Sequence, residues 1–410
     1  MSSGIRAERL FADLCNRYFL RGFVFHSPRF FNPSENEAGD IVLWVRRQVV
    51  VFEVVARDVT GGPSTKQFVK RIGGKRDQLL KDYRAFTDPN IDIHLVNEQG
   101  EKVVFDTRDL AIFGFSGIVI VDCDSHIEKL HFGTIQKSLA LPFPVAIMSR
   151  QDFLDLTDEV DTVPDLTYYL LDRFEFLKQV YESHPQYFLD LNGRLERNLI
   201  AFYKTYENKF AIDDWKPEKA LDYYSIYTSA SRDRILARNT ENAESFIIDK
   251  ILDFLRLNNK PTDSTLLHSW ELATMTRRQR AGWLSEKIRD AIERMRGGNP
   301  RRHFAFFNEG TGCWLVFYFR HGGSSGEFKE EVERLTKYKL LVEMKERDFE
   351  YSVFGYGFRK SLIETGATFD ELILQIEDAD DYSSVPESEY KLACQYFGKL
   401  WSQHIREFPT

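Results

Sequence analysis

Cysteine is scarce in this chain, which has four in 410 residues. Cys15, Cys123, Cys313 and Cys394 lie far apart, and none forms a CxxC pair or a cluster with histidine. This spacing excludes a cysteine-based zinc site and a disulfide framework. It is typical of a protein in a reducing, cytoplasmic compartment.

Long apolar runs are also absent, since no stretch approaches the roughly 18 residues of a membrane-spanning helix. The first ten residues lack the apolar core of a signal peptide. A Walker loop, GxGxxG, GxSxG and HExxH are missing as well, so no common nucleotide-binding or hydrolase motif applies. The net charge of −8 argues against wholesale wrapping by nucleic acid but permits local basic patches.

The length of 410 residues predicts two or three domains. Residues 1–160 read as helix, β-hairpin, helix, strand, helix and strand. Several of these strands are apolar throughout, which indicates a mixed central sheet flanked by helices. Residues 161–298 read as almost wholly helical, and residues 299–410 as strands and helices. We therefore predict an α/β N-terminal domain, an all-α middle and a small α+β C-terminal domain.

A β-hairpin between Glu37 and Asp58 carries two acids on otherwise apolar strands. Asp40 precedes the first run, and Glu53 lies inside the second. A two-residue turn centred between Arg46 and Arg47 would set Asp40 opposite Glu53, about 5 Å away. Arg-Arg is poor chemistry for that turn, so we expect a longer loop with a slipped pairing. Either register keeps both acids near one strand end.

Two carboxylates held together would repel, and a divalent cation removes the conflict. Mg²⁺ prefers oxygen ligands and binds through one or two carboxylates together with waters and substrate phosphate. Asp40 and Glu53 are therefore candidate ligands of Mg²⁺ or Mn²⁺. The alternative is that one or both lie at a solvated sheet edge.

The order Asp, strand, turn, Glu on the next strand and then a basic helix resembles the restriction-endonuclease-like PD-(D/E)XK phosphodiesterase superfamily. Asp40 matches the metal-binding Asp of that family and Glu53 its metal-binding Glu. Glu8 corresponds to an acid that the family often adds from its first helix. The resemblance covers about the first 150 residues. It implies a restriction-endonuclease-like fold, metal-dependent cleavage of nucleic acid, most simply DNA, and a role in restriction or antiviral defence.

The match departs at the third motif position, where the family has Lys and this chain has Val55. Three interpretations stay open: the Lys has migrated to the following helix, the domain binds without catalysis, or the match is accidental. Lys66 and Lys70, on the first turns of that helix, are the candidate catalytic replacements. Arg57 is the other cation available, but it stays protonated and would be a poor base.

Two basic segments could contact nucleic acid. The predicted helix from Thr65 has seven basic and two acidic residues between Lys66 and Arg84, Lys75 and Arg76 among them. Residues 273–302 have nine basic and three acidic residues, including Arg277, Arg278 and Arg280. Such density can neutralise phosphates or an acidic partner surface. The ordinary alternative is a solvated helix face.

A second Glu-x-Lys, formed by Glu343 and Lys345, falls on a predicted strand at residues 339–344. No Asp lies one hairpin upstream, so we expect these two to be surface strand residues. The predicted function is metal-dependent hydrolysis of nucleic acid. The alternatives are a catalytically inactive nuclease-fold subunit that binds nucleic acid or a protein partner and, less well supported, a helical scaffold. A homo-oligomer is also compatible with the sequence.

Overall fold

The structure is a computed structural model of the chain. It describes residues 3–19, 23–31, 35–46, 48–56, 65–96, 102–105, 114–122, 132–157, 160, 162–183, 195–205, 210, 248, 251–252, 255, 263–276, 279–296, 301–308, 311–347, 352–360, 371–382 and 384–397. The chain divides into two compact units, residues 1–240 and 241–410. Each unit is described by itself.

A five-stranded mixed sheet forms the centre of the first unit. Its strand order is β1-β4-β5-β8-β9, with β1 (Val24–His26), β4 (Ile41–Val45), β5 (Gln48–Ala56), β8 (Gly114–Asp122) and β9 (Val145–Ser149). The first three strands pair antiparallel, and β5, β8 and β9 are parallel to one another. The predicted mixed sheet is confirmed. Its apolar strands are buried because helices cover both faces.

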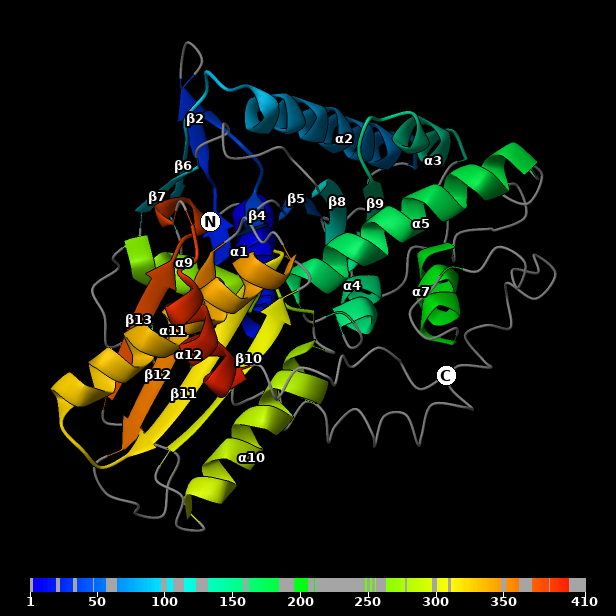
Figure 1. Cartoon of the computed structure of the whole chain (residues 1–410). Coiled ribbons are helices and arrows are strands. Elements are labelled where there is room, and N and C mark those ends of the chain that lie inside the picture. The colour runs from blue at the N-terminus through cyan, green and yellow to red at the C-terminus, as the bar shows by residue number, and fades with distance from the viewer. Residues whose placement is uncertain are drawn as a thin grey trace. The chain divides into compact units, whose positions relative to one another are not determined.

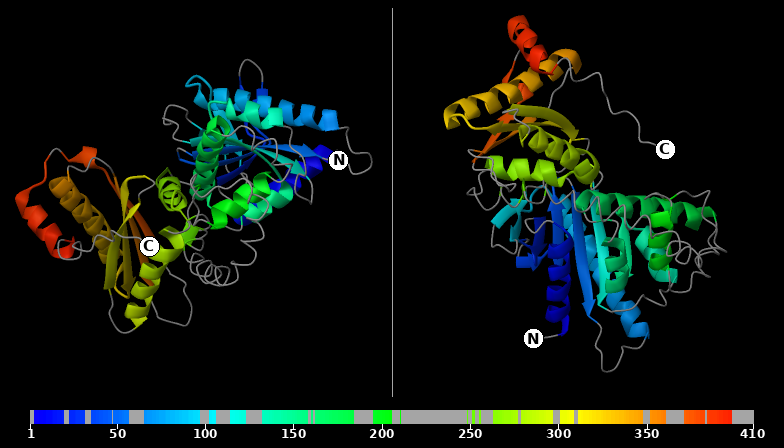
Figure 2. Two further views of the ribbon diagram at one scale, coloured as in Figure 1. Left: turned by 90° about the vertical axis from the view of Figure 1, so that its right-hand side faces the viewer. Right: turned by 90° about the horizontal axis from the view of Figure 1, so that it is seen from below.

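Different helices cover the two faces of this sheet. On one face α1 (Ser3–Tyr18) packs on β5 and α4 (Arg150–Thr157) on β8 and β9, with the Phe11 ring 5.2 Å from the Phe52 ring. On the other face α2 (Thr65–Thr87) packs on β5 and β8, with the rings of Tyr83 and Phe115 5.3 Å apart. Figure 1 and the left view of Figure 2 show the sheet between α2 and α5 (Val163–Ser183). Because side chains alternate along a strand, Glu53 faces α2 while Phe52 faces α1.

The rest of the first unit is smaller. A second, antiparallel sheet has the order β3-β2-β6-β7, with β3 (Glu35–Glu37), β2 (Arg29–Phe31), β6 (Ile93–Val96) and β7 (Lys102–Phe105). Two further helices are α3 (Phe132–Leu139) and α7 (Leu195–Thr205). The helix α5, predicted as the start of a helical domain after residue 160, contacts β4, β5, β8 and β9. The predicted boundaries near residues 160 and 298 stay predictions.

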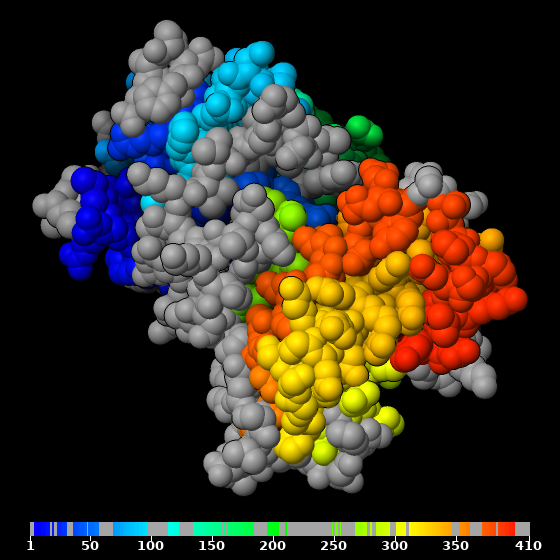
Figure 3. Space-filling model, turned by 60° about the vertical axis from the view of Figure 1, so that its left-hand side comes forward, coloured from blue at the N-terminus to red at the C-terminus, as the bar shows by residue number. Residues whose placement is uncertain are grey.

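The second unit has a four-stranded sheet of order β10-β11-β12-β13, in which only β11 and β12 are parallel. The strands are β10 (Arg301–Asn308), β11 (Cys313–His321), β12 (Val353–Lys360) and β13 (Glu371–Glu377). The helices are α9 (Asp263–Ala273), the π-helix η5 (Gln279–Leu284), α10 (Ser285–Arg296), α11 (Ser325–Arg347), the short 3₁₀ turn η6 (Ala379–Asp381) and α12 (Glu387–Phe397). Figure 3 shows α11 and α12, in yellow and red, side by side on the surface.

The strand predicted at residues 339–344 is wrong, because α11 continues unbroken through this segment. Leu340, Leu341 and Val342 form a short apolar run, which does not distinguish a strand from a buried helix. The ion pair between Lys339 and Glu343 spans four residues, one helical turn. Glu343 is therefore a buried helix residue, 2% exposed, and not the predicted surface strand residue.

No helix among the residues described is long and apolar enough to cross a membrane.

Candidate functional site

The hairpin that carries the two acids has the tight register. Ile41 pairs with Phe52 and Val45 with Gln48, so the same register extended by one residue sets Asp40 opposite Glu53. The expected slip of the pairing is wrong. Arg46 adopts the positive φ, 50°, that a two-residue hairpin turn requires, and its carbonyl accepts a 2.6 Å hydrogen bond from Trp44 Nε1. This added bond explains how an Arg-Arg turn is tolerated.

Asp40 is oriented by the backbone around it. Gly39 precedes it with φ 91°, and a Cβ on Gly39 would lie 2.4 Å from Val51 Cγ1, so only glycine fits. The Asp40 amide donates to the Phe52 carbonyl at 3.0 Å, and the Val54 amide donates to Asp40 Oδ2 at 2.6 Å. The carboxylate is thus fixed against β5, with a side chain only 8% exposed.

Lys75, from α2, lies between the two acids. Its Nζ is 2.8 Å from Asp40 Oδ2 and 2.5 Å from Glu53 Oε2. The lysine side chain is 31% exposed, whereas the Glu53 side chain is 2% exposed. The site is therefore a buried pair of carboxylates whose shared ammonium reaches the surface.

Electrostatics inside the site are unbalanced toward negative charge. Burial, together with the charge of Asp40, raises the pKa of Glu53 to about 9, although Lys75 acts in the opposite direction. Burial lowers the pKa of Lys75, but the charges of Glu53 and Asp40 outweigh it and leave the pKa above its ordinary value. Lys75 is therefore a permanent cation. Glu53 keeps its proton at neutral pH unless another positive charge compensates it.

A third acid, Asp82, completes this arrangement and was not predicted from the sequence. It has no exposed surface, and Gln78 Nε2 donates to its Oδ1 at 3.0 Å. Burial raises the pKa of Asp82 to about 7, against the lowering effect of hydrogen bonds with Gln78 and Glu53. The signal that could have revealed it is helical spacing: Lys75 and Asp82 recur with the buried Ile72, Leu79 and Phe86 at intervals of three and four.

Glu8 approaches the same site from α1. Its carboxylate is partly buried, which raises its pKa, and the charges of Asp40 and Glu37 raise it further while Lys75 lowers it. The predicted acid of the first helix therefore lies within electrostatic range of Asp40. The structure brings Asp40 and Glu53 together, and Glu8 interacts electrostatically with Asp40 and Lys75.

The donor set fits a hard divalent cation. Two carboxylate oxygens already converge on one cation, the Lys75 ammonium, and within the described part of the chain Asp40 Oδ1 takes part in no hydrogen bond. No group of three or more His, Cys, Asp or Glu side chains close enough to surround a metal is found among those same residues. Mg²⁺ does not require such a cage, because it keeps several waters and binds through one or two carboxylates and substrate phosphate.

Lys66 and Lys70 are the predicted replacements for the missing motif lysine. Lys70 is exposed on α2, and the side chain of Lys66 lies outside the described residues. The lysine that reaches the two carboxylates is Lys75, predicted only as a contact to nucleic acid. On the same helix, Arg76 pairs with Asp77 at 2.7 Å and is 12% exposed.

The second basic segment presents fewer described arginines for contact with nucleic acid than its composition predicts. Arg57, Arg277 and Arg278 lie outside the described residues. Arg280 is 5% exposed in the π-helix and donates to the Ala273 carbonyl at 2.9 Å. Its burial does not fit the predicted contact with nucleic acid, because its guanidinium already bonds within its own unit.

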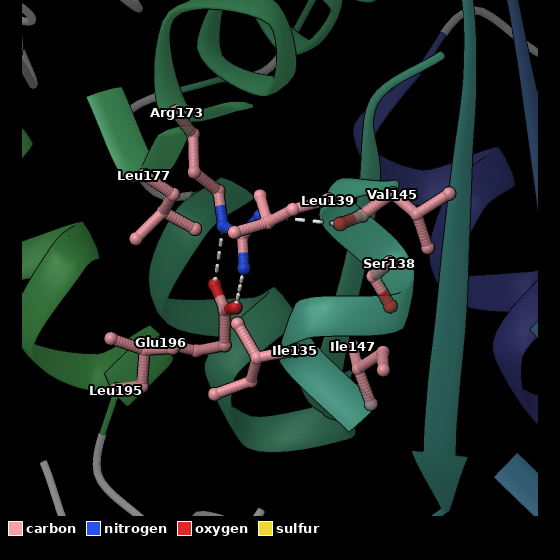
Figure 4. A pocket seen from close by; sticks show the side chains of 9 residues that line it. All are labelled: Ile135, Ser138, Leu139, Val145, Ile147, Arg173, Leu177, Leu195 and Glu196. Atoms are coloured by element: carbon pink, nitrogen blue, oxygen red, sulfur yellow. Dashed lines mark hydrogen bonds and ion pairs between the residues drawn. The ribbon is translucent and has the colours of Figure 1, made fainter. Parts of the chain in front are cut away.

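A small cavity in the first unit is lined by residues from α3, β9, α5 and α7, shown in Figure 4. Its polar content is Ser138 and the buried pair Arg173 and Glu196, where Arg173 Nε donates to Glu196 Oε2 at 3.0 Å. Arg173 also donates to the Val145 carbonyl at 3.2 Å. These groups satisfy one another and tie α5 to α7 and β9, so the cavity is a packing feature.

Comparison of the chain with protein-family models, with curated protein sequences and with solved structures gives no match.

Proposed function

We propose that this chain is a metal-dependent phosphodiesterase that cleaves nucleic acid, with a restriction-endonuclease-like first unit. The observation that carries the proposal is the meeting of Asp40, Glu53 and Lys75 at one end of a hairpin. Val55 occupies the motif position of the lysine, and Lys75 supplies an ammonium to the same two carboxylates from α2. Apart from the short strands β1–β3, β6 and β7, the element order α1, hairpin, α2, β8, α3, β9 is the one that the resemblance requires.

Each side chain has a role that follows from its surroundings. Asp40 and Glu53 would hold Mg²⁺ or Mn²⁺, with Glu8 near enough to add charge. When bound, such a cation activates water and neutralises the scissile phosphate. Lys75 stays protonated, so it acts as a fixed positive charge and not as a base. Its partly exposed ammonium can donate a hydrogen bond to a phosphate oxygen as negative charge develops there.

The nucleic acid would approach along α2. Lys70, Lys81 and Arg84 are exposed on this helix, and their charges attract a phosphate backbone. The contacts are to phosphate, so binding along α2 is expected to depend on salt and not on sequence. DNA is the simplest substrate, and a restriction or antiviral role would follow from cleavage of foreign DNA.

The second candidate is a nuclease-fold subunit that binds nucleic acid or a protein partner without cutting. The observation in its favour is that the Lys75 ammonium already lies between the carboxylates, where it can serve as an internal counter-ion. A chain of this kind would bind DNA equally well with and without a divalent cation.

The experiment compares cleavage of plasmid DNA, single-stranded DNA and RNA in Mg²⁺ and in Mn²⁺. The variants are Asp40→Ala, Glu53→Ala and Lys75→Met, with Lys70→Met as the matched control from the same helix. We expect cleavage to fall by about 10²–10³ or more in the first three variants and to change little in the control. Absence of cleavage of every substrate by the native chain would refute the catalytic proposal and favour the binding subunit.

A further inference from the structure

A buried carboxylate with an unsatisfied oxygen lies at the inner side of the candidate site. Asp82 has no exposed surface. Its Oδ1 accepts from Gln78, and its Oδ2 is buried with no hydrogen-bond donor among the residues described. Leaving such an oxygen unpaired is costly, and more so when the group is charged. A group of this kind needs either a proton shared with its neighbour or a cation.

The surroundings of Asp82 indicate what kind of partner it needs. Its side chain lies within hydrogen-bonding reach of Glu53 and within range of the charges of Asp40 and Lys75. Two carboxylates facing each other are both acceptors, so neither can satisfy the other without a positive charge between them. The missing partner is therefore a proton or a cation, and not another hydrogen-bonding side chain.

The charge balance of the site favours a cation of charge two. Asp40, Glu53 and Asp82 are three buried carboxylates, and Lys75 is the ammonium that the described part of the chain places among them. When a bound cation keeps all three acids ionised, they exceed the ammonium by two formal negative charges, the charge of one divalent ion. Burying an uncompensated charge is far more costly than burying a neutral cluster.

The placement of Asp82 on α2 also suits this role. Asp82 follows Lys75 by seven residues, which is two helical turns, so both side chains lie on the helix face that packs on β5. At a position on that face of α2 we would otherwise expect an apolar residue, like Ile72 and Leu79. One helix thus provides both the fixed cation and the third acid.

We infer that Asp82 is a third carboxylate of the cation site, whose Oδ2 becomes a ligand when Mg²⁺ or Mn²⁺ binds at Asp40 and Glu53. The inference rests on the proposed function for the first two ligands and adds a residue that the motif does not contain. It predicts that a bound cation draws Asp82 toward the two hairpin carboxylates, since the described residues do not yet group three such side chains closely enough to surround a metal. Oxygen ligands of this kind suit hard divalent cations.

The test measures Mn²⁺ binding to the full-length protein by calorimetry, without nucleic acid. Asp82→Asn keeps the size of the side chain and an oxygen that can accept from Gln78, but it removes the charge. We expect it to weaken Mn²⁺ binding about tenfold or more, as Asp40→Asn should. Glu37→Gln is the control for general loss of negative charge, because Glu37 is exposed and interacts electrostatically with Glu8. We expect it to change binding less than about twofold.

Thermal unfolding distinguishes a ligand from a structural residue. Without metal, Asp82→Asn should melt above the native protein, because it replaces a carboxylate whose burial is unfavourable with a neutral amide. With saturating Mn²⁺ the native protein should gain more in melting temperature than the variant. A residue that only supports the fold predicts the reverse, a lower melting temperature in Asp82→Asn with or without Mn²⁺.

The outcomes separate the two proposals. Native protein that binds Mn²⁺, with Asp82→Asn binding it equally well, would overturn the inference and leave the metal-dependent function standing. If the native protein binds no Mn²⁺, both the metal-dependent function and the role of Asp82 as a ligand are refuted. A loss in Asp82→Asn together with no effect of Asp40→Asn would place the cation elsewhere and contradict the site as described.

Discussion

Each unit of the molecule contains a buried pair of Glu and Lys, and the two pairs differ in what surrounds them. In the first unit Lys75 bridges Glu53 and Asp40, which come from a hairpin, and Asp82 lies beside them. In the second unit Lys339 pairs with Glu343 one turn away on α11, and both side chains are at most 3% exposed. The Lys339 ammonium also lies 3.6 Å from the Trp314 ring centre.

The difference lies in charge balance and access. In the α11 pair a buried lysine meets a buried glutamate beneath the rings of Trp314 and Phe397, and such a pair fixes structure. The hairpin site has an excess of acids and an ammonium that is 31% exposed, so it can still exchange ligands with solvent. The glutamate of the intact Glu-x-Lys is therefore held in a structural pair with Lys339, while the lysine of that motif, Lys345, is 47% exposed. The motif that lacks its lysine marks the candidate site.

The largest expected effect comes from transferring the lysine of the site from position 75 to position 55. Val55 is two residues from Glu53 on β5, so both side chains face α2. Lys75→Met should reduce cleavage by about 10²–10³. Adding Val55→Lys should restore part of it, because the ammonium returns to the motif position beside the same carboxylates. Initial rates on plasmid DNA in Mg²⁺ test this. Rescue by Lys at position 55 would not occur if Lys75 only supported the fold.

Breaking the other pair should affect stability instead of cleavage. Lys339→Met leaves the Glu343 carboxylate without its ammonium and should destabilise the second unit by about 3–5 kcal/mol. Urea unfolding measures the loss, and cleavage is assayed under conditions where the variant is folded. The double change Lys339→Met with Glu343→Leu should recover much of the stability. Full stability in the single variant would contradict the interpretation of the pair as structural.

The hairpin site should make the metal-free protein less stable as pH rises. The pKa of Glu53 rises from 4.5 to about 9 on folding, and that of Asp82 from 3.8 to about 7. Between these limits the folded state binds more protons than the unfolded state, so the stability they contribute is lost as pH increases through 7 toward 9. Lys75 stays charged below its unfolded value of 10.5 and adds no slope in this window.

Urea midpoints between pH 6 and pH 9, followed by circular dichroism, measure this dependence. Glu53→Gln should flatten the upper part of the profile, since the amide does not titrate. Saturating Mg²⁺ should reduce the slope in the native protein. Equal slopes in the native protein and in Glu53→Gln would show that Glu53 does not titrate in this range.

The smallest effect concerns Gly73 and Gly74, in the middle of α2 just before Lys75. No atom lies within 4 Å of a Cβ added at either position, so the fold itself has room for a side chain. Gly73→Ala and Gly74→Ala should each stabilise the protein by about 0.5–1 kcal/mol, because alanine favours the helix. Thermal unfolding checks this. Destabilisation by either change would indicate a contact that the helix alone does not explain.

Parts of the candidate site could be predicted from the sequence. Asp40 and Glu53 were identified because single acids on apolar strands are costly unless compensated. Their register was one of two alternatives, and the structure adopts the one disfavoured by turn chemistry because Arg46 accepts a positive φ. Nearness along the chain favours Lys66 and Lys70, but it is a weaker criterion than the helix face on which a lysine lies. Lys75 and Asp82 share their face with Ile72, Leu79 and Phe86, a pattern available in the sequence.

From the sequence one can predict the two acids of the site, the apolar strands around them and the basic helix that follows. These predictions use alternation and helical spacing, which depend only on neighbours in the chain. The sequence does not show which lysine contacts the acids, nor that Asp82 lies within hydrogen-bonding reach of Glu53. Those contacts depend on how α2 rotates as it packs on β5 and β8. That rotation is set by side chains distant in the sequence, such as Phe115, which packs on Tyr83 from 32 residues away. Only the tertiary structure therefore decided that one ammonium and three carboxylates share a site.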